Sequence, residues 1–229
     1  MKKVLVVGSG YGIGKSIFSK LKSIPHIEPV GISRRGENFK KEESLVHGQN
    51  YKCDLRNEND IVHFTEFLRA NEYFPDAVYF TSGDGLFKPI AEISSIEWDD
   101  HFSLNVRGVF LFLKELHSLL QKAISPIVCF IASTASRQGF ANSSAYCASK
   151  HALLGLARAI REEWKAEGIR ITSVVLGAVD TPIWDDRPEF SREDMIPPEE
   201  LSDFLVSLLQ VNDKINLDEI VLLPKKGIL

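Results

Sequence analysis

Cysteine is scarce in this sequence of 229 residues, and the few cysteines present do not form a recognisable set. Cys53, Cys129 and Cys147 are odd in number and none belongs to a C-x-x-C pair, so the sequence predicts neither a disulfide framework nor a zinc site. A reducing cytoplasm suits such a chain. We interpret Cys147 as a packing residue, because no histidine partner is evident that would activate its thiol.

Long apolar runs and an excess of positive charge are also missing. The apolar stretch at residues 4–7 ends at Gly8 and is too short for a signal peptide or a membrane anchor, so we expect a cytosolic protein. The formal net charge is −4 and the isoelectric point is about 5.9. No basic stripe is available to neutralise nucleic-acid phosphates, so neither a nucleic acid nor a membrane is predicted as a partner.

The pattern that is present predicts one α/β domain. The sequence shows no internal repeat, low-complexity tract or obvious linker, and its length fits a single large domain over residues 1–229. Short apolar runs alternate with amphipathic segments such as 58–70 and 144–164, which predicts buried parallel strands separated by helices. The apolar runs are residues 4–7, 29–32, 77–80, 126–130, 171–176 and a last one within 215–224. We expect a doubly wound, mainly parallel sheet of about seven strands with helices on both faces.

A glycine-rich turn lies where the first strand gives way to a helix. Its pattern is G-x-x-x-G-x-G through Gly8, Gly12 and Gly14. Gly8 permits a tight turn, Gly12 lets the backbone approach a pyrophosphate, and Gly14 permits close packing of the helix. The helix N-terminus supplies free N–H groups for the phosphates. The predicted contacts to a dinucleotide are Gly8, Ser9, Gly10, Tyr11, Gly12, Ile13 and Gly14. A merely tight turn is the alternative.

This turn resembles that of the short-chain dehydrogenase/reductase family, which commonly reads T-G-x-x-x-G-I-G. Val7 stands in place of the threonine, which removes a hydroxyl that ties neighbouring elements together in the family. The resemblance extends over nearly the whole chain. It implies a Rossmann-like fold, an NAD or NADP cofactor, and a homodimer or homotetramer formed through the helices near 106–122 and 145–166.

The end of the second strand favours NADP over NAD. An acidic residue there would bind the ribose of NAD, whereas an arginine would accept the 2′-phosphate of NADP. The sequence at that place has Ser33, Arg34 and Arg35 and no carboxylate. An exposed basic turn is the alternative reading. Tyr11 also occupies a turn position that many NADP-using relatives fill with a basic residue.

Further cofactor contacts are implied by the resemblance alone. Asp54 would hydrogen-bond the adenine edge beside Leu55, with a helix N-cap near Asn57 as its competing role. Val179 and Thr181 would contact the nicotinamide amide. The segment FTSG at 80–83 stands where the family usually has N-N-A-G, so of that motif only the glycine remains. The predicted contacts in this segment are Ser82 and Gly83.

The segment SAYCASKHALLG carries the predicted acid/base. Tyr146 and Lys150 are four residues apart at the start of a helix, so they share a face. A phenol with a pKa near 10 is a poor acid/base at neutral pH, and a nearby ammonium would lower that pKa. His151, beside Lys150, is interpreted as a helix-surface residue. A tyrosine and a lysine at this spacing are common on protein surfaces. The pair alone therefore does not predict catalysis, and the neighbouring residues have to support it.

Two neighbours complete the family's pattern. Ser133 follows a buried strand thirteen residues before the tyrosine, where its hydroxyl can hold a substrate oxygen near the phenol. Ser136 is the competing serine. Asn105 lies in an N-x-x-G setting within a predicted helix and resembles the family's asparagine that anchors a water near the lysine for proton relay. The predicted catalytic residues are therefore Asn105, Ser133, Tyr146 and Lys150.

Together these residues predict hydride transfer between a nicotinamide and a small carbonyl or alcohol substrate. The proline-rich segment 181–198 is interpreted as a substrate lid, with Trp184, Asp185 and Asp186 as possible substrate contacts. A protein that senses or scaffolds NADP(H) without turnover is the alternative, motivated by the altered FTSG segment. A serine hydrolase is disfavoured, because no G-x-S-x-G elbow surrounds Ser133. The sequence does not identify the substrate.

Overall fold

Seven strands form one fully parallel sheet in the computed structural model, which describes residues 1–229. The order across the sheet is β3-β2-β1-β4-β5-β6-β7, so the chain builds outward from β1 to one edge and then outward to the other. Their bounds are β1 Lys2–Val7, β2 Ile27–Ser33, β3 Asn50–Lys52, β4 Ala77–Phe80, β5 Ile127–Ser133, β6 Arg170–Leu176 and β7 Glu219–Leu222. The predicted doubly wound sheet is confirmed.

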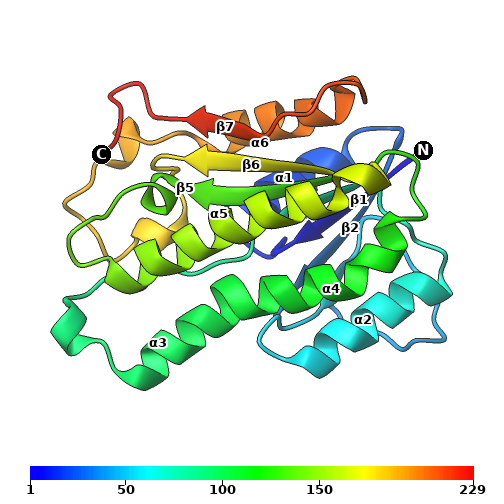
Figure 1. Cartoon of the computed structure of the whole chain (residues 1–229), viewed down its shortest axis with the longest axis horizontal. Coiled ribbons are helices and arrows are strands. Elements are labelled where there is room, and N and C mark those ends of the chain that lie inside the picture. The colour runs from blue at the N-terminus through cyan, green and yellow to red at the C-terminus, as the bar shows by residue number, and fades with distance from the viewer.

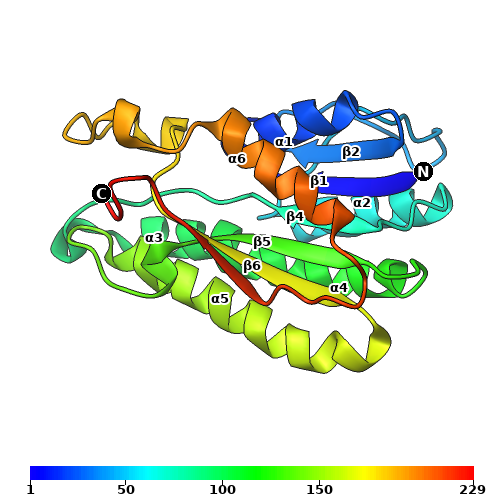
Figure 2. The ribbon, with the colours of Figure 1, turned by 90° about the horizontal axis from the view of Figure 1, so that it is seen from above.

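Helices cover both faces of the sheet (Figures 1 and 2). The helices are α1 Gly12–Lys22, α2 Glu58–Ala70, α3 Ser95–Phe102, α4 Gly108–Leu120, α5 Ser144–Trp164 and α6 Pro198–Ser207. The core on one face contains buried residues of α1 and α6, and the core on the other contains buried residues of α2, α4 and α5. None of the helices combines the length and the apolar character that spanning a bilayer requires.

The strands are buried on both faces because their apolar residues run without a polar interruption. Along β1, Leu5 and Val7 join one core while Val4 and Val6 join the other, as the two-residue period of a strand requires. A run that is apolar at every position therefore has to lie between two helical layers. This is why the short apolar runs were sufficient to predict the sheet.

The segment around Asn105 differs from the continuous helix that we expected. Helix α3 ends at Phe102, residues Ser103–Arg107 form a π-helical turn, and α4 begins at Gly108. A Cβ at Gly108 would lie 2.4 Å from the Leu55 carbonyl oxygen, so only glycine allows this close approach. The wider π turn changes the direction of its side chains, and such turns are frequent at functional sites.

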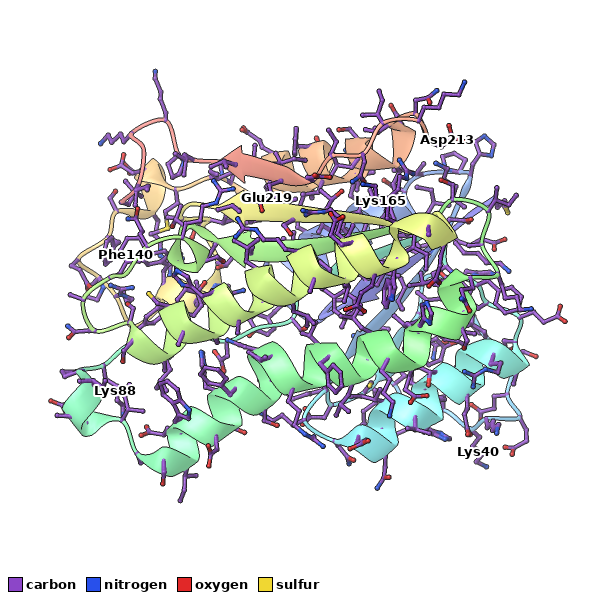
Figure 3. The ribbon with its side chains drawn as sticks, viewed as in Figure 1. Lys40, Lys88, Phe140, Lys165, Asp213 and Glu219 are labelled. Atoms are coloured by element: carbon purple, nitrogen blue, oxygen red, sulfur yellow. The ribbon has the colours of Figure 1, made fainter.

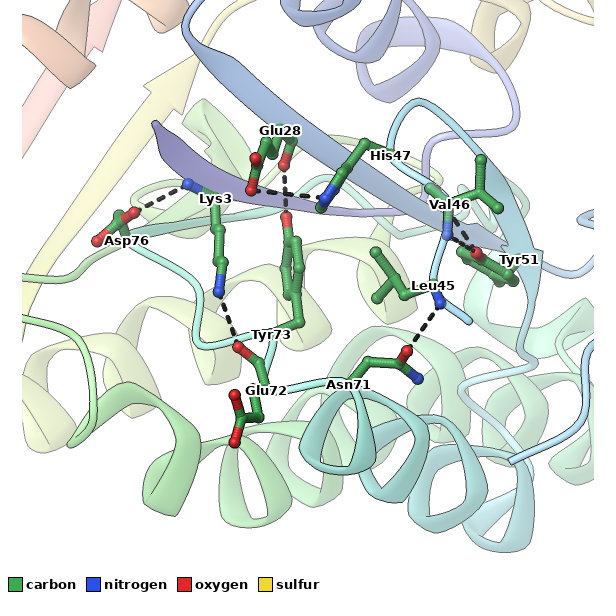
Figure 4. A network of polar contacts seen from close by, with 10 residues as sticks. All are labelled: Lys3, Glu28, Leu45, Val46, His47, Tyr51, Asn71, Glu72, Tyr73 and Asp76. Carbon is green, nitrogen blue, oxygen red and sulfur yellow. Dashed lines mark hydrogen bonds and ion pairs between the residues drawn. The ribbon is translucent and has the colours of Figure 1, made fainter. Parts of the chain in front are cut away.

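Polar contacts fasten the amino ends of the central strands (Figure 4). The backbone N–H of Lys3 donates to the Asp76 carboxylate at 2.8 Å, and the buried Tyr73 hydroxyl donates to the Glu28 carbonyl at 2.7 Å. The Lys3 ammonium donates to the Glu72 carbonyl at 2.7 Å. These bonds fix the loop before β4 at the end of the sheet opposite to the carboxyl ends of the strands.

Candidate active site

A cavity of about 410 Å³ lies at the carboxyl ends of the strands. Parallel α/β sheets bind ligands at this edge, where the strand order reverses between β1 and β4. Phe140, one of its lining residues, lies at this end of the molecule in Figure 3, while Lys165 and Asp213 lie at the other. The predicted residues that line it are Gly8, Gly10, Tyr11, Gly12, Ile13, Ser33, Arg34, Leu55, Ser82, Gly83, Ser133, Tyr146, Lys150, Val179 and Thr181. Those that do not are Ser9, Gly14, Arg35, Asp54 and Asn105.

The glycine turn leaves no room for side chains where a pyrophosphate would approach. Gly8 has φ of 97° and Gly12 has φ of 55°, a left-handed region that glycine adopts at little cost. A Cβ at Gly8 would lie 2.6 Å from the Ser82 nitrogen. Helix α1 begins at Gly12 with no side-chain cap from Tyr11, so the N–H groups of its first turn are free for an anion. This cradle fits a dinucleotide.

Two residues of the predicted turn serve the fold instead. Ser9 is buried, and its hydroxyl lies 3.2 Å from the Ile32 carbonyl and 2.7 Å from the Asn50 side-chain oxygen. Gly14 packs beneath the turn, where a Cβ would lie 2.2 Å from the Gly8 carbonyl oxygen. The Ser9 hydroxyl is thus used between strands, and the predicted contact of Ser9 with a cofactor stays a prediction.

The unusual residues at 7 and 81 compensate each other. Val7 lacks the hydroxyl that the family's threonine would supply, but the Thr81 hydroxyl donates to the Val7 carbonyl at 2.8 Å. The N–H groups of Thr81 and Ser82 donate to the same carbonyl at 2.9 and 3.0 Å. The hydroxyl that joins the ends of β1 and β4 thus comes from the segment after β4 and not from β1. The Ser82 hydroxyl is buried without a partner, and Ser82 lines the cavity.

The adenosine end of the cavity is formed after β2 and β3. Arg34 is exposed and lines the cavity, whereas Arg35 is exposed outside it. The Asp54 carboxylate accepts from the Arg56 backbone N–H at 3.0 Å and does not line the cavity. The alternative role of Asp54 as a helix cap is wrong, because the Asn57 side chain caps α2. Its predicted contact with adenine stays a prediction.

Ser133 and Tyr146 face one another at the end of β5. Burial raises the pKa of the Tyr146 phenol above its usual value of 10.0, and the neighbouring Ser133 hydroxyl opposes that shift. The competing Ser136 is buried outside the cavity, and its hydroxyl accepts from the Ser133 N–H at 3.2 Å. Ser133 is therefore the serine that accompanies the tyrosine.

Lys150 lies behind Tyr146 and is itself buried. Its ammonium donates to the Ile131 carbonyl at 3.2 Å and lies 5.7 Å from the centre of the Tyr146 ring. Desolvation lowers the pKa of Lys150 to about 8. We expected Lys150 to lower the pKa of Tyr146, but in this structure the pKa of Tyr146 is raised. Desolvation is the largest cause of the pKa shift of each residue, and it disfavours the charged form of both.

The buried lysine gives the fold a measurable pH dependence. Below about pH 8 Lys150 is charged in the folded and unfolded chains alike, and the cost of burying that charge is present in full. Between pH 8 and 10.5 the unfolded chain holds a proton that the folded chain has released, so stability rises with pH. We expect the free energy of unfolding, relative to Lys150→Met, to rise by up to about 3 kcal/mol across this window. Denaturant titrations of both proteins measure it, and a pH-independent difference would contradict it.

Asn105 is buried beneath the cavity wall. Its side-chain oxygen accepts from the Asp84 N–H at 2.9 Å, and its amide nitrogen donates to the Asp84 carbonyl at 3.0 Å. A Cβ at Gly83 would lie 3.5 Å from both the Asn105 oxygen and the Lys150 nitrogen. The two groups therefore approach the same small space, with no direct hydrogen bond between them.

His101 joins this network and was missed by the sequence analysis. It is buried one helical turn before Asn105, and its Nε2 lies 3.1 Å from the Asn105 amide nitrogen and 3.0 Å from the Ser149 hydroxyl. Burial lowers the pKa of the imidazole, which favours the neutral ring. The spacing of four residues places His101 and Asn105 on the same helix face, and this could have linked them. The sequence does not show, however, that these polar side chains on that face are buried.

The predicted lid supplies part of the cavity wall. The guanidinium of Arg192 holds the segment in shape by donating to the Thr181 carbonyl at 2.8 Å and to the Asp185 carboxylate at 2.7 Å. Trp184 lines the cavity, whereas Asp185 and Asp186 do not, so the structure gives these carboxylates no contact with it. The lining residues that the sequence analysis missed include Phe87, Phe140, Arg187, Phe190, Ile228 and Leu229.

Two residues were predicted to have no catalytic role, His151 as a helix-surface residue and Cys147 as a packing residue. His151 is exposed on α5, and its Nδ1 lies 2.9 Å from the Cys147 carbonyl of the preceding turn. Cys147 is buried, which agrees with a packing role. Neither residue lines the cavity.

Comparisons with known proteins agree with this geometry. The chain is 28% identical to a sepiapterin reductase of Chlorobaculum tepidum, covering 99% of this chain and 98% of that protein. It is 28% identical to a 2-dehydro-3-deoxy-D-gluconate 5-dehydrogenase of Pseudoalteromonas atlantica over 84% of this chain and 76% of that protein. The first of these matches, which covers nearly the whole chain, includes the glycine turn and the tyrosine segment.

Solved structures show the same fold. A metagenomic short-chain oxidoreductase in complex with NADP has a TM-score of 0.79 at 24% identity, covering 98% of this chain and 97% of that chain. An alcohol dehydrogenase from Thermococcus sibiricus complexed with 5-hydroxy-NADP has a TM-score of 0.84 at 21% identity, covering 97% and 96%. The family model described as short chain dehydrogenase matches residues 2–191. The chain therefore belongs to the short-chain dehydrogenase/reductase family of oxidoreductases.

Proposed function

We propose that this protein is an NADP(H)-dependent oxidoreductase acting on a small carbonyl or alcohol substrate. The observation that carries the proposal is the meeting of Tyr146, Ser133 and the glycine turn in one cavity. When bound, the dinucleotide supplies or accepts the hydride at its nicotinamide C4. In the reducing direction the hydride goes to the carbonyl carbon, the Tyr146 hydroxyl gives its proton to the carbonyl oxygen, and the product is an alcohol.

The chain's own residues divide the remaining tasks. Ser133 donates a hydrogen bond that holds the substrate oxygen beside the phenol. Lys150 and Asn105 approach a common space beside Gly83. We propose that a water in this space returns a proton toward Tyr146. Val179 and Thr181 line the cavity beyond the end of β6, where they hold the nicotinamide amide.

The preference for NADP rests on Arg34. It is the predicted arginine that lines the cavity at the end of β2, and a guanidinium there pairs with a 2′-phosphate. We expect Arg34→Asp to raise Kd for NADPH by about 10- to 100-fold, with little loss or a gain for NADH, because a carboxylate repels the phosphate and accepts from a ribose hydroxyl. Fluorescence titrations with both dinucleotides measure this. Arg35→Asp is the matched control, and an unchanged preference in Arg34→Asp would remove the assignment.

The alternative of a sensor without turnover arose from the altered FTSG segment. The bond from Thr81 to Val7 gives one of the altered residues a structural role, so the threonine at this position does not argue against catalysis. NADPH titration combined with a panel of ketones and aldehydes tests the two functions. Consumption of NADPH with one of these substrates supports the oxidoreductase, and binding without any reduction supports the sensor.

We propose further that the protein is a homo-oligomer, as the resemblance implies, and that it works in the cytoplasm, which suits its three unpaired cysteines. Helices α4 and α5 form the outer surface of one sheet face (Figure 2), and Phe110 on α4 is half-exposed. An apolar ring at such a position gains free energy when a second copy covers it. Light scattering after size exclusion gives the number of copies, and a monomer at all concentrations would contradict this proposal.

A further inference from the structure

Arg187 of the lid is enclosed by aromatic rings at the wall of the cavity. Its guanidinium carbon lies 4.6 Å from the centre of the Phe87 ring, 5.1 Å from that of Trp184 and 4.4 Å from that of Phe190. The side chain is only 20% exposed. Rings at these distances attract the cation and hold it in place, so the guanidinium is positioned before any substrate arrives.

The hydrogen-bonding capacity of this guanidinium is mostly unused. Its Nε donates to the Glu189 carboxylate at 3.3 Å, and that carboxylate is 59% exposed. Neither terminal nitrogen of Arg187 donates a hydrogen bond within the chain, and its one ion pair is with the exposed Glu189. Arg192 of the same lid differs, because both of its terminal nitrogens are engaged, with the Asp180 and Asp185 carboxylates. A largely enclosed arginine whose two terminal nitrogens donate no hydrogen bond is suited to a planar anion, which it can bind through two parallel hydrogen bonds.

The location relates this arginine to the proposed chemistry. The Phe87 ring packs against both groups, with its centre 4.6 Å from the Arg187 guanidinium carbon and 5.1 Å from the centre of the Tyr146 ring. The guanidinium and the phenol therefore belong to the same wall of the cavity. Arg34 lines the cavity from the end of β2, and Lys150 is buried behind the tyrosine, so Arg187 is the cation that the lid contributes on the substrate side.

The geometry points to a substrate that carries a carboxylate as well as its reacting carbonyl, with Arg187 binding the carboxylate and the aromatic rings covering the apolar body of the substrate. This inference rests on the proposed function for the identity of the reacting group. Binding of a carboxylate does not depend on turnover. The three aromatic rings around Arg187 and its free terminal nitrogens are present whether or not hydride transfer takes place.

Reduction of 4-formylbenzoate and of its methyl ester tests the substrate class. The two aldehydes share the reacting group and the ring but differ in charge at the far end. We expect Arg187→Met to lower kcat/KM for 4-formylbenzoate by about 10- to 100-fold, the loss typical of a removed pair of charge-assisted hydrogen bonds. The value for the ester should change by less than about threefold. Equal losses for acid and ester, or a wild-type preference for the ester, would overturn the inference.

Binding separates this inference from the proposed function. Calorimetry with benzoate and benzamide, on protein saturated with NADP, should show benzoate binding at least about tenfold more tightly, and Arg187→Met should abolish the difference. Arg69→Met, at an exposed arginine of α2 that donates to the Ser118 hydroxyl and does not line the cavity, is the matched control and should keep it. Arg187-dependent benzoate binding without reduction of any aldehyde would refute the proposed function and support the carboxylate site. Reduction of both aldehydes without such binding would support the proposed function and overturn the carboxylate site. Wild-type protein that binds neither probe would also overturn the site.

Discussion

Replacing Tyr146 with phenylalanine is expected to lower kcat by about 10²- to 10⁴-fold, the contribution of a positioned general acid. The Kd for NADPH should stay within about threefold of wild type, because the hydroxyl acts on the substrate oxygen. The ring itself is retained, so its contact with Phe87, at 5.1 Å between centres, should persist and the cavity wall should keep its shape. Single-turnover absorbance at the nicotinamide band measures the chemical step.

A matched control is available at the other end of the sheet. Tyr73→Phe also removes one buried hydroxyl, which donates to the Glu28 carbonyl at 2.7 Å. That change should cost about 1 kcal/mol of stability and leave kcat unchanged. If Tyr146→Phe behaves like Tyr73→Phe, with a small loss of stability and normal turnover, the assignment of the acid/base is wrong.

Gly14→Ala is expected to destabilise the fold by about 1–3 kcal/mol and to weaken NADPH binding more than tenfold. The added Cβ would lie 2.2 Å from the Gly8 carbonyl oxygen and 2.3 Å from the Thr81 hydroxyl. Neither atom can move freely, because one is backbone and the other is bonded to the Val7 carbonyl. Relief of the clash must displace the turn itself, which is where the pyrophosphate is proposed to bind.

Gly155→Ala supplies the comparison for this clash. Gly155 is also helical, but a Cβ there would meet no atom within 4 Å. Because alanine is the better helix former, this change should stabilise the protein by about 0.5–1 kcal/mol. Thermal unfolding and NADPH titration of both variants give the contrast. Similar behaviour of the two variants would show that α1 does not depend on close packing beneath the glycine turn.

Local patterns were sufficient for much of the fold and for the core of the site. Residues 58–70 and 144–164 were predicted as helices from their apolar spacing, and α2 and α5 have these bounds. Tyr146 and Lys150 could be paired from sequence because their separation is fixed by the helix that carries both. Ser133 could be added because parallel strands end at one edge of the sheet, so the last residue of β5 must reach that edge.

Features that depend on distant segments could not be predicted in this way. The hydroxyl of Thr81 replaces the one absent at Val7, but nothing in either segment shows that they are hydrogen-bonded. The sequence analysis predicted a lowered pKa for Tyr146, whereas burial raises it in the structure. The degree of burial could not be predicted because it depends on segments that meet only in the assembled cavity. The surroundings of Arg187 come from both sides of the catalytic residues in sequence and meet only in the folded chain.

Transfer of deuterium is the most direct test of the central claim. NADPH labelled in turn at each of its two C4 positions is incubated with 4-formylbenzoate and its methyl ester, and the alcohol products are analysed by mass spectrometry. The account predicts that one labelled form, and not the other, places a single deuterium on the carbinol carbon with wild-type protein, and that Tyr146→Phe forms almost no labelled product. NADPH that binds while no deuterium reaches these or any of a wider panel of carbonyl compounds would contradict it.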